Sequence, residues 1–135
     1  MRVVLDTNVL VSGLLTPLGP PGRIVDLVLA GLVTLVADDR VLAEYGDVLR
    51  RPRFGFAPGD VSTVLEFVAA ESERVIPPPL AVVLPDADDL SFLEVAAAAA
   101  VPLVTGYPRH FAPTRGAHQV ELMTPAELLG RLTGA

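Results

Sequence analysis

The sequence predicts an α/β fold, in which a central, mainly parallel sheet of about five strands is flanked by helices. Short β-rich runs alternate along the chain with segments whose apolar residues repeat at helical spacing. The first run, residues 2–5, contains three consecutive apolar residues, which is typical of a strand buried on both faces in a parallel sheet. Neither a repeat nor a linker divides the 135 residues, so we expect one domain spanning residues 1–135.

The expected elements follow one another in a regular order. Strands are expected at residues 2–5, 33–37, 74–76, 102–105 and 120–122, with residues 81–84 as a further extended candidate. Helices are expected at residues 9–15, 21–30, 39–51, 59–68, 90–100 and from residue 125 onward. Pro21 suits a helix start and Pro52 ends a helix. Thr124, Pro125 and Glu127 form the capping signature of the last helix.

The charge and composition exclude several classes of function. A net charge of −6 and a pI near 4.7 argue against a general nucleic-acid coat, although a local basic patch or bound metal ions could override this. All ten basic residues other than histidine are arginine, so a Walker A loop, a Schiff base and a catalytic lysine are excluded. Cysteine is also absent, which removes disulfides, thiolate nucleophiles and zinc–sulfur sites.

The sequence gives no sign of a membrane segment. No apolar run reaches the roughly 18 residues that cross a bilayer. Asp6 and Asn8 interrupt the N-terminal run where a signal peptide needs its apolar region. We therefore expect a soluble cytoplasmic protein without a membrane partner.

The turn after the first strand is the first candidate site. Asp6, Thr7 and Asn8 follow that strand directly, and open α/β folds bind ligands beyond the carboxyl ends of their strands. A carboxylate beside a hydroxyl and an amide is a candidate active site at such a position. The alternative is that Asp6 and Asn8 only form a turn or cap the next helix.

The helix expected at residues 39–51 supplies a second carboxylate. Its apolar stripe consists of Val41, Leu42, Tyr45, Val48 and Leu49. Glu44 falls beside the edge of this stripe and can face the edge of the sheet, whereas Asp47 falls nearly opposite and faces water. The alternative for Glu44 is an ordinary solvated position, because glutamates are mostly exposed.

The acidic run before residue 90 supplies a third carboxylate. Extrapolated back from the buried face of the following helix, Asp89 lies toward that face, and Asp88 points away as the better helix cap. Glu94 lies on the far side of the helix, and the direction of Asp86 is open. The alternative is that the whole run only favours the positive end of the helix dipole.

These three carboxylates follow different strand and helix units. A parallel sheet would bring Asp6, Glu44 and Asp89 to one edge. Clustered carboxylates repel one another and raise each other's pKa values unless a cation is present. Oxygen ligands suit Mg²⁺ or Mn²⁺ better than Zn²⁺ or Cu²⁺. A hard divalent ion is therefore expected.

In their order, these motifs resemble the PIN-domain ribonucleases, especially the toxins of bacterial toxin–antitoxin pairs related to virulence-associated protein C. The resemblance covers nearly the whole chain. It rests on the opening Val-Val-Leu-Asp-Thr-Asn-Val-Leu, on Glu44 in a following helix, on residues 85–96 with their acidic run, and on residues 103–106.

The resemblance implies a three-layer PIN-like fold and a Mg²⁺- or Mn²⁺-dependent endoribonuclease that cuts single-stranded RNA. It also implies frequent homodimers and an antitoxin that blocks the site. Matched by position, the acidic metal ligands are Asp6, Glu44 and Asp89. Asn8 matches the polar residue after the first acid, and Thr105 matches the hydroxyl after the fourth strand.

One position departs from the family pattern. Where the family usually has Thr-Gly-Asp, this chain has Thr105, Gly106 and Tyr107. The fourth acidic position therefore holds a phenol that is neutral at pH 7, and Asp86 is the candidate substitute. The departure keeps an alternative open, in which a degenerate PIN-like module binds an antitoxin or RNA without cutting it.

The expected reaction is metal-assisted hydrolysis, in which water attacks an RNA phosphodiester in line. Asn8 and Thr105 would orient ligands or water. Arg53, Arg109 and Arg115 are weak candidates for holding phosphates.

The sequence gives less support to a role for the other basic residues and to a third class of function. Arg50 and Arg51 are better explained as helix C-terminal charge, and His110 and His118 are unplaced candidates for general acids. A haloacid-dehalogenase-type phosphatase is disfavoured, because that class needs a lysine and a second aspartate where this chain has Asn8.

Overall fold

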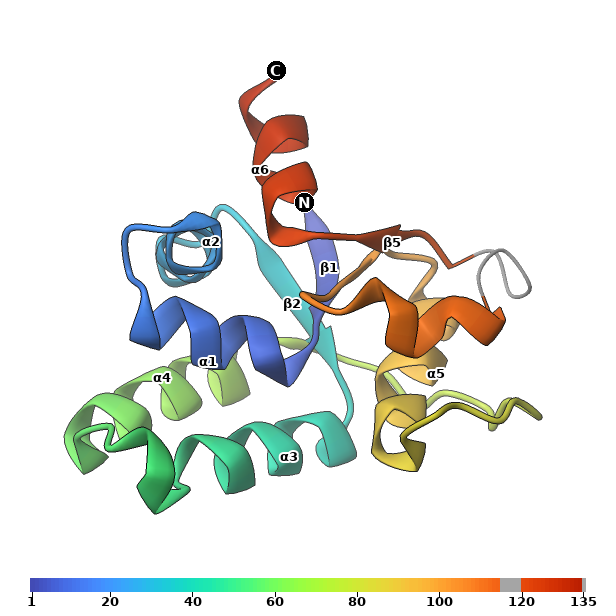
Figure 1. The fold of residues 1–135 in the computed structure, drawn as a ribbon, viewed down its shortest axis with the longest axis horizontal. Helices are drawn as coiled ribbons and strands as arrows, with labels where there is room; N and C mark the ends of the chain where they lie inside the picture. The colour runs from blue at the N-terminus through green and yellow to red at the C-terminus, as the bar shows by residue number, and fades with distance from the viewer. Residues whose placement is uncertain (115–119, 135) are drawn as a thin grey trace.

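In the computed structural model, which describes residues 1–114 and 120–134, five parallel strands form the middle of three layers (Figure 1). The strands are β1 (Arg2–Leu5), β2 (Thr34–Ala37), β3 (Glu73–Arg74), β4 (Leu103–Val104) and β5 (Leu122–Met123). Their order across the sheet is β3-β2-β1-β4-β5, and every neighbouring pair is parallel. The predicted α/β fold with a parallel sheet of about five strands is confirmed.

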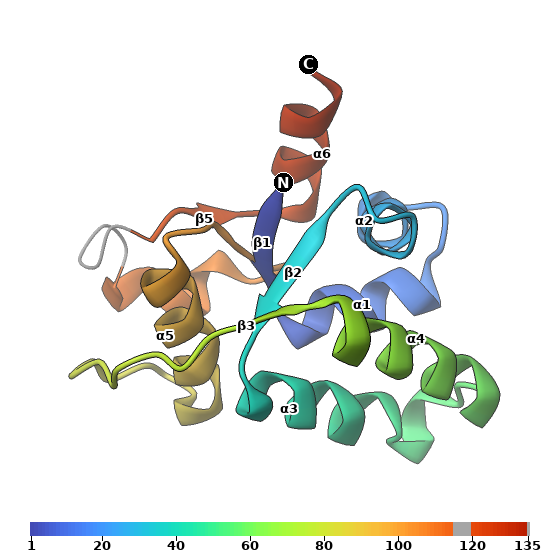
Figure 2. The same cartoon turned by 180° about the vertical axis from the view of Figure 1, so that it is seen from behind.

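Within the described part of the chain, six α-helices flank the sheet. They are α1 (Thr7–Leu15), α2 (Pro20–Leu29), α3 (Asp39–Leu49), α4 (Pro58–Glu71), α5 (Leu90–Ala99) and α6 (Pro125–Thr133). Three short 3-10 helices, η1 (Pro52–Phe54), η2 (Ala87–Asp89) and η3 (Pro108–Thr114), complete the described elements. In Figures 1 and 2 the sheet separates α1 and α2 from α5, which packs against β1 and β2. None of the described helices has the length and apolar character needed to span a membrane.

Strand β1 occupies the centre of the sheet because its side chains are apolar on both faces. Val3, Val4 and Leu5 are completely buried. Val3 is in register with Leu35 of β2, and Val4 is in register with Leu103 of β4. The carboxyl end of β1 therefore opens between the ends of its two neighbours, where the residues after each strand can meet.

Tyr45 fixes α3 to this end of the sheet. Its side chain is completely buried, and its hydroxyl donates a hydrogen bond to the carbonyl of Leu5, the last residue of β1. Its ring packs at a tilt on Phe92 of α5, with 6.2 Å between ring centroids. One side chain of the predicted stripe thus links α3, α5 and the strand that leads into Asp6.

The edge strands differ from the sequence expectation. β3 covers Glu73–Arg74 rather than residues 74–76, and β5 covers Leu122–Met123 rather than residues 120–122. The amide of Val75 still donates to Ala37, at 3.1 Å, but three prolines follow at residues 77–79. Because proline has no amide hydrogen to donate, pairing stops there, and the candidate segment 81–84 stays outside the sheet.

Candidate active site

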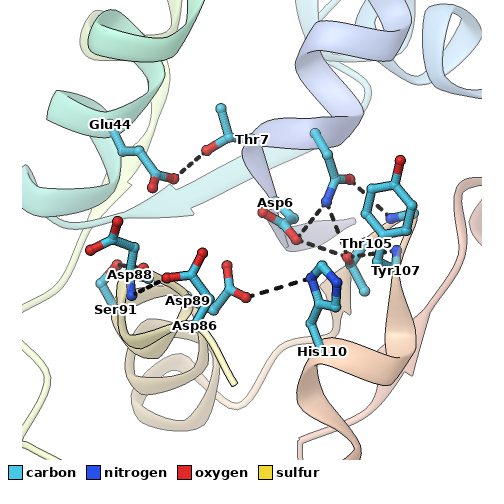
Figure 3. Close-up of polar contacts among 12 residues, drawn as sticks. Asp6, Thr7, Glu44, Asp86, Asp88, Asp89, Ser91, Thr105, Tyr107 and His110 are labelled. Atoms are coloured by element: carbon cyan, nitrogen blue, oxygen red, sulfur yellow. Dashed lines mark hydrogen bonds and ion pairs between the residues drawn. The ribbon is translucent and has the colours of Figure 1, made fainter. Parts of the chain in front are cut away.

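Asp6 lies at the carboxyl end of β1, and its side chain is held by two neighbours (Figure 3). Its Oδ2 accepts hydrogen bonds of 2.8 Å from the Thr105 hydroxyl and 2.8 Å from the Asn8 amide. The residue is only 4% exposed. Burial raises the pKa of Asp6, and the bond from Thr105 is the largest of the effects that oppose this. A buried carboxylate is thus fixed at the edge of the sheet.

Asn8 joins the start of α1 to the turn after β4. Its Nδ2 donates to Asp6, and its Oδ1 accepts a hydrogen bond of 3.0 Å from the amide of Gly106. A Cβ added to Gly106 would lie 3.2 Å from that Oδ1, which is a tight contact. The turn after β4 is therefore held close to Asp6 through one amide side chain.

Glu44 reaches the same region from α3. It is half-buried, and its Oε2 accepts a hydrogen bond of 2.5 Å from the hydroxyl of Thr7. Burial raises the pKa of Glu44, and the negative charges of Asp6, Asp88 and Asp86 raise it further. Asp47 points to solvent and pairs with Arg51 at 3.1 Å. Glu44 and Asp47 thus face in the directions that helical geometry predicts.

Asp89 completes the group from the start of α5. Its side chain is 13% exposed, and its Oδ2 is buried without a hydrogen-bond partner. Nδ1 of His110 lies 3.7 Å from this Oδ2. Burial is the main cause that raises the pKa of Asp89 to about 7, followed by the charges of Asp6 and Asp86.

The prediction that Asp88 is the helix cap is wrong. The carboxylate of Asp86 accepts a hydrogen bond of 2.9 Å from the amide of Asp88, so Asp86 is the residue that caps η2. This happens because a 3-10 turn precedes α5 and moves the capping position toward the N-terminus. The side chain of Asp88 lines a cavity of about 360 Å³ together with Glu44 and Ser91.

Glu94, which is expected on the far side of the helix, is buried rather than facing solvent. Glu94 is 3% exposed and accepts hydrogen bonds of 2.8 Å from Arg40 and 2.7 Å from the amide of Leu80. Arg40 also donates to Asp38, at 2.8 Å. The irregular segment 75–84 covers this side of α5. Because that segment has no periodic pattern, a helical projection of α5 alone gives no sign of it.

Of the predicted phosphate-binding residues, the two that the structure describes lie on different elements. Arg53 lies in η1 beyond the end of α3, where its guanidinium stacks 4.8 Å from the centre of the Phe54 ring. Arg109 is exposed in η3. Arg115 and His118 lie outside the described residues, so their placement stays a prediction.

Sequence reasoning missed three features of the site region. The sequence does not identify Thr7 as the donor to Glu44, although Thr7 directly follows Asp6. Arg40 was overlooked although it lies one turn before Glu44 on the same helix. The third is a stack of the Tyr107 and His110 rings, with centroids 5.3 Å apart and planes inclined by 23°. Residues three apart lie above one another in a 3-10 turn, so the spacing was a usable signal.

The donor set is suited to a hydrated hard cation. Among residues 1–114 and 120–134, no three histidine or acidic side chains lie close enough together to form a direct metal cage. Asp6, Glu44 and Asp89 nevertheless have raised pKa values, and the charge of Asp6 contributes to the shifts of both Glu44 and Asp89. Mg²⁺ usually binds through one or two carboxylates and keeps several waters. These oxygens therefore fit such an ion, with the buried Oδ2 of Asp89 as an available donor.

Comparisons with known proteins give a consistent result. A family model described as the PIN domain matches residues 2–106, a region that contains Asp6, Glu44, Asp89 and Thr105 and ends just before Tyr107. The uncharacterized protein MJ1680 of Methanocaldococcus jannaschii is 30% identical over 109 residues, which cover 78% of this chain and 70% of that protein.

Two solved structures share the fold. VapBC2 from Rickettsia felis, bound to a DNA fragment from its promoter, superposes with a TM-score of 0.59 at 18% identity and covers 92% of this chain and 98% of its own. VapBC-1 from nontypeable Haemophilus influenzae superposes with a TM-score of 0.60 at 15% identity, covering 93% and 99% respectively. At these identities the likeness shows the fold.

Proposed function

Because the chain belongs to the PIN-domain family, we propose that it is a metal-dependent endoribonuclease that cuts single-stranded RNA. We propose further that it is the toxin of a toxin–antitoxin pair, and the fold shared with the two VapBC structures supports this. An antitoxin partner, a homodimer, a cytoplasmic location and a single domain over residues 1–135 belong to the same proposal.

The observation that carries the proposal is the way in which Asp6 is held. Asp6 occupies the N-cap position of α1, but its side chain makes no capping hydrogen bond there. Its Oδ2 is instead fixed by Asn8 and Thr105, within the electrostatic reach of Asp89. A carboxylate that served only as a turn or cap would not need to be buried beside other acids, which costs stability.

In this proposal the three acids hold a Mg²⁺ or Mn²⁺ ion, directly or through water, with Asp86 as an additional candidate. The bound ion would supply the positive charge that activates a water and stabilises the charge developing on the phosphate. Asn8 and Thr105 keep the oxygen of Asp6 in place. Both side chains are uncharged, so neither competes with Asp6 as a charged ligand of the ion. Candidate residues for holding the RNA backbone remain Arg53, Arg109 and Arg115.

A second candidate function is a PIN-like module that binds an antitoxin or RNA without cutting it. Tyr107 favours it, because the position usually holding a fourth acid carries a neutral phenol. Asp86 could replace this acid only in part, since one of its oxygens already accepts the amide of Asp88. The two candidates differ in whether the native chain breaks phosphodiester bonds.

A cleavage assay separates these candidates. A mixed-sequence single-stranded RNA is incubated with Mg²⁺ or Mn²⁺ and the native chain, Asp6→Asn or Tyr107→Asp. We expect the native chain to cleave and Asp6→Asn to lose roughly 100-fold or more, because it removes a charged ligand that the reaction needs. Asp60→Asn is the matched control, because that acid is exposed in the first turn of α4.

The outcomes lead to different conclusions. Cleavage by Tyr107→Asp alone would identify the native chain as the degenerate module. Cleavage that persists in Asp6→Asn with all metal chelated would refute the metal-dependent mechanism.

A further inference from the structure

The turn after β4 carries an aromatic side chain into the site on a firmly held backbone. The amide of Gly106 donates to Asn8 at 3.0 Å, and the amide of Tyr107 donates to the Thr105 hydroxyl at 3.1 Å. That hydroxyl in turn donates to Asp6. The backbone of Tyr107 is thus two hydrogen bonds away from the central carboxylate, and its ring lies beside Thr105 at the margin of the acidic group (Figure 3).

The ring of Tyr107 is supported by His110 and remains accessible. The two rings stack with 5.3 Å between centroids, because the amide of His110 donates to the Tyr107 carbonyl and closes a tight turn. Tyr107 is still 58% exposed. Among the described residues, it is the single aromatic side chain in the group of large hydrophobic residues that are exposed. A supported aromatic surface is therefore open to solvent beside the catalytic candidates.

The supporting ring also borders the acids directly. Nδ1 of His110 lies 3.7 Å from Oδ2 of Asp89. Tyr107 itself adds no charge in a chain with a net charge of −6. A carboxylate at this position would repel an arriving polyanion, whereas an aromatic ring attracts a base through its face.

We propose that Tyr107, backed by His110, is a stacking platform for one nucleobase of single-stranded RNA, next to the phosphate held at the acidic group. This inference rests on the proposed function and adds to it a residue that positions the substrate. A base in a duplex is stacked on both faces, so the platform selects strands whose bases are unpaired. The ring is already oriented by His110, so little conformational freedom is lost when a base binds.

Binding is measured in an Asp6→Asn background, so that cleavage does not consume the probe. The probe is a short fluorescein-labelled single-stranded RNA of mixed sequence, followed by fluorescence anisotropy in buffer containing Mg²⁺. Tyr107→Phe keeps the ring, Tyr107→Leu keeps apolar bulk without a ring, and Tyr107→Ala removes both. Ile76→Ala is the matched control, because Ile76 is 99% exposed on the segment that follows β3.

The expected pattern depends on the ring. Tyr107→Phe and the Ile76→Ala control should bind within about twofold of the background protein, while Tyr107→Leu and Tyr107→Ala should bind about tenfold more weakly. Equal binding by Tyr107→Ala would overturn the proposal, as would a loss in Tyr107→Phe as large as in Tyr107→Ala. Absence of RNA binding by every variant would overturn it as well.

Tyrosine fluorescence gives a second readout that a merely structural role would not change. The chain has no tryptophan and two tyrosines, of which Tyr45 is completely buried. Single-stranded RNA should quench the emission of Tyr107, and Tyr107→Phe should abolish this quenching. Duplex RNA of the same sequence should quench much less. Equal quenching by both forms would contradict base stacking.

The two proposals fail in different ways. A native chain that never cleaves, but whose RNA affinity requires the ring at position 107, would refute the nuclease and leave the platform. A chain that cleaves with metal, but whose affinity is the same with tyrosine and alanine at that position, would refute the platform alone.

Discussion

The carboxylate of Asp89 is a costly group for the folded protein to keep. Its Oδ2 is buried without a donor, and Asp6 and Asp86 add their negative charges. Protonation relieves this cost, which is why the pKa of Asp89 is raised to about 7. Such a group weakens the metal-free fold at neutral pH, and this identifies it as a candidate for function rather than for stability.

We expect Asp89→Asn to stabilise the metal-free protein at alkaline pH. The pKa of Asp89 is about 7 in the folded chain, against 3.8 for an unperturbed aspartate, so the folded state binds this proton more tightly. The free energy of unfolding therefore falls as pH rises between these two values, and the loss is complete above the folded value. The gain from Asp89→Asn should be on the order of 2 kcal/mol at about pH 8 and small near about pH 4.

The measurement is chemical denaturation with EDTA present at both pH values. Asp26→Asn, which removes an exposed carboxylate of α2, is the control and should change stability by less than about 0.5 kcal/mol. A native protein that is as stable as Asp89→Asn at the higher pH would show that the buried charge is not destabilising.

At this scale the sequence predicts which acids lie at the same edge of the sheet but not how they are held. The directions of Glu44 and Asp47 follow from a regular helix, in which the 3.6-residue repeat is sufficient. The roles of Asp86 and Asp88 depend on a 3-10 turn that no periodic pattern announces. The stack of Tyr107 on His110 likewise depends on local backbone geometry after β4.

Among the elements, α2 closely approaches the turn that precedes it at a glycine. A Cβ added to Gly22 of α2 would lie 2.2 Å from the carbonyl oxygen of Pro17, which is backbone and cannot move aside. Gly59 of α4 has no atom within 4 Å of such a Cβ. These two glycines occupy helices for different reasons, since only the first is needed for packing.

We therefore expect Gly22→Ala and Gly59→Ala to change stability in opposite directions. Gly22→Ala should lose about 2 kcal/mol or more, because the backbone clash forces α2 away from the turn before it. Gly59→Ala should be neutral or gain up to about 1 kcal/mol from helix propensity. Thermal unfolding of the two variants checks this, and a loss in Gly59→Ala equal to that in Gly22→Ala would contradict it.

The extended segment 75–84 is held to α5 through Glu94. Truncation in Glu94→Ala removes the acceptor for the Leu80 amide and for Arg40, and we expect a loss of about 1–3 kcal/mol. The segment should then be cut faster in limited proteolysis mapped by mass spectrometry. Glu73→Ala is a control on the edge strand. Unchanged cutting within residues 75–84 of Glu94→Ala would show that Glu94 does not retain this segment.

At the element scale, the sequence predicts those strands and helices that have a clear apolar pattern or capping residues. The central strand β1 and the helices α3 and α6 carry clear apolar patterns or capping residues, and the predicted capping box of Thr124 and Glu127 is present. β3 and β5 have two residues each, so their pairing depends on the neighbouring strand more than on their own composition. The packing that buries Glu94 is tertiary and has no local signature.

The whole molecule carries a net charge of −6, so any salt stabilises it to some extent by screening the repulsion between its charges. A divalent ion bound at a specific site should stabilise it further. We expect Mg²⁺ or Mn²⁺ to raise the melting temperature at about pH 8, because the ion binds the folded acids and not the unfolded chain. NaCl at matched ionic strength should have a smaller effect. Asp6→Asn should remove most of the specific gain, and an equal gain in that variant would contradict an ion held by Asp6.

The topology of the sheet also determines the order in which contacts around the candidate site form during synthesis. β1 is the central strand and is made first, yet its neighbour β4 begins at Leu103, and the hydroxyl that holds Asp6 lies 99 residues away. Contacts of such long range form late, after a large loop has closed. During synthesis, a chain that emerges from the ribosome up to α5 presents Asp6 without Thr105. During synthesis Asp6 therefore lacks the hydroxyl that holds it, and the candidate site is complete only after residue 105 has emerged.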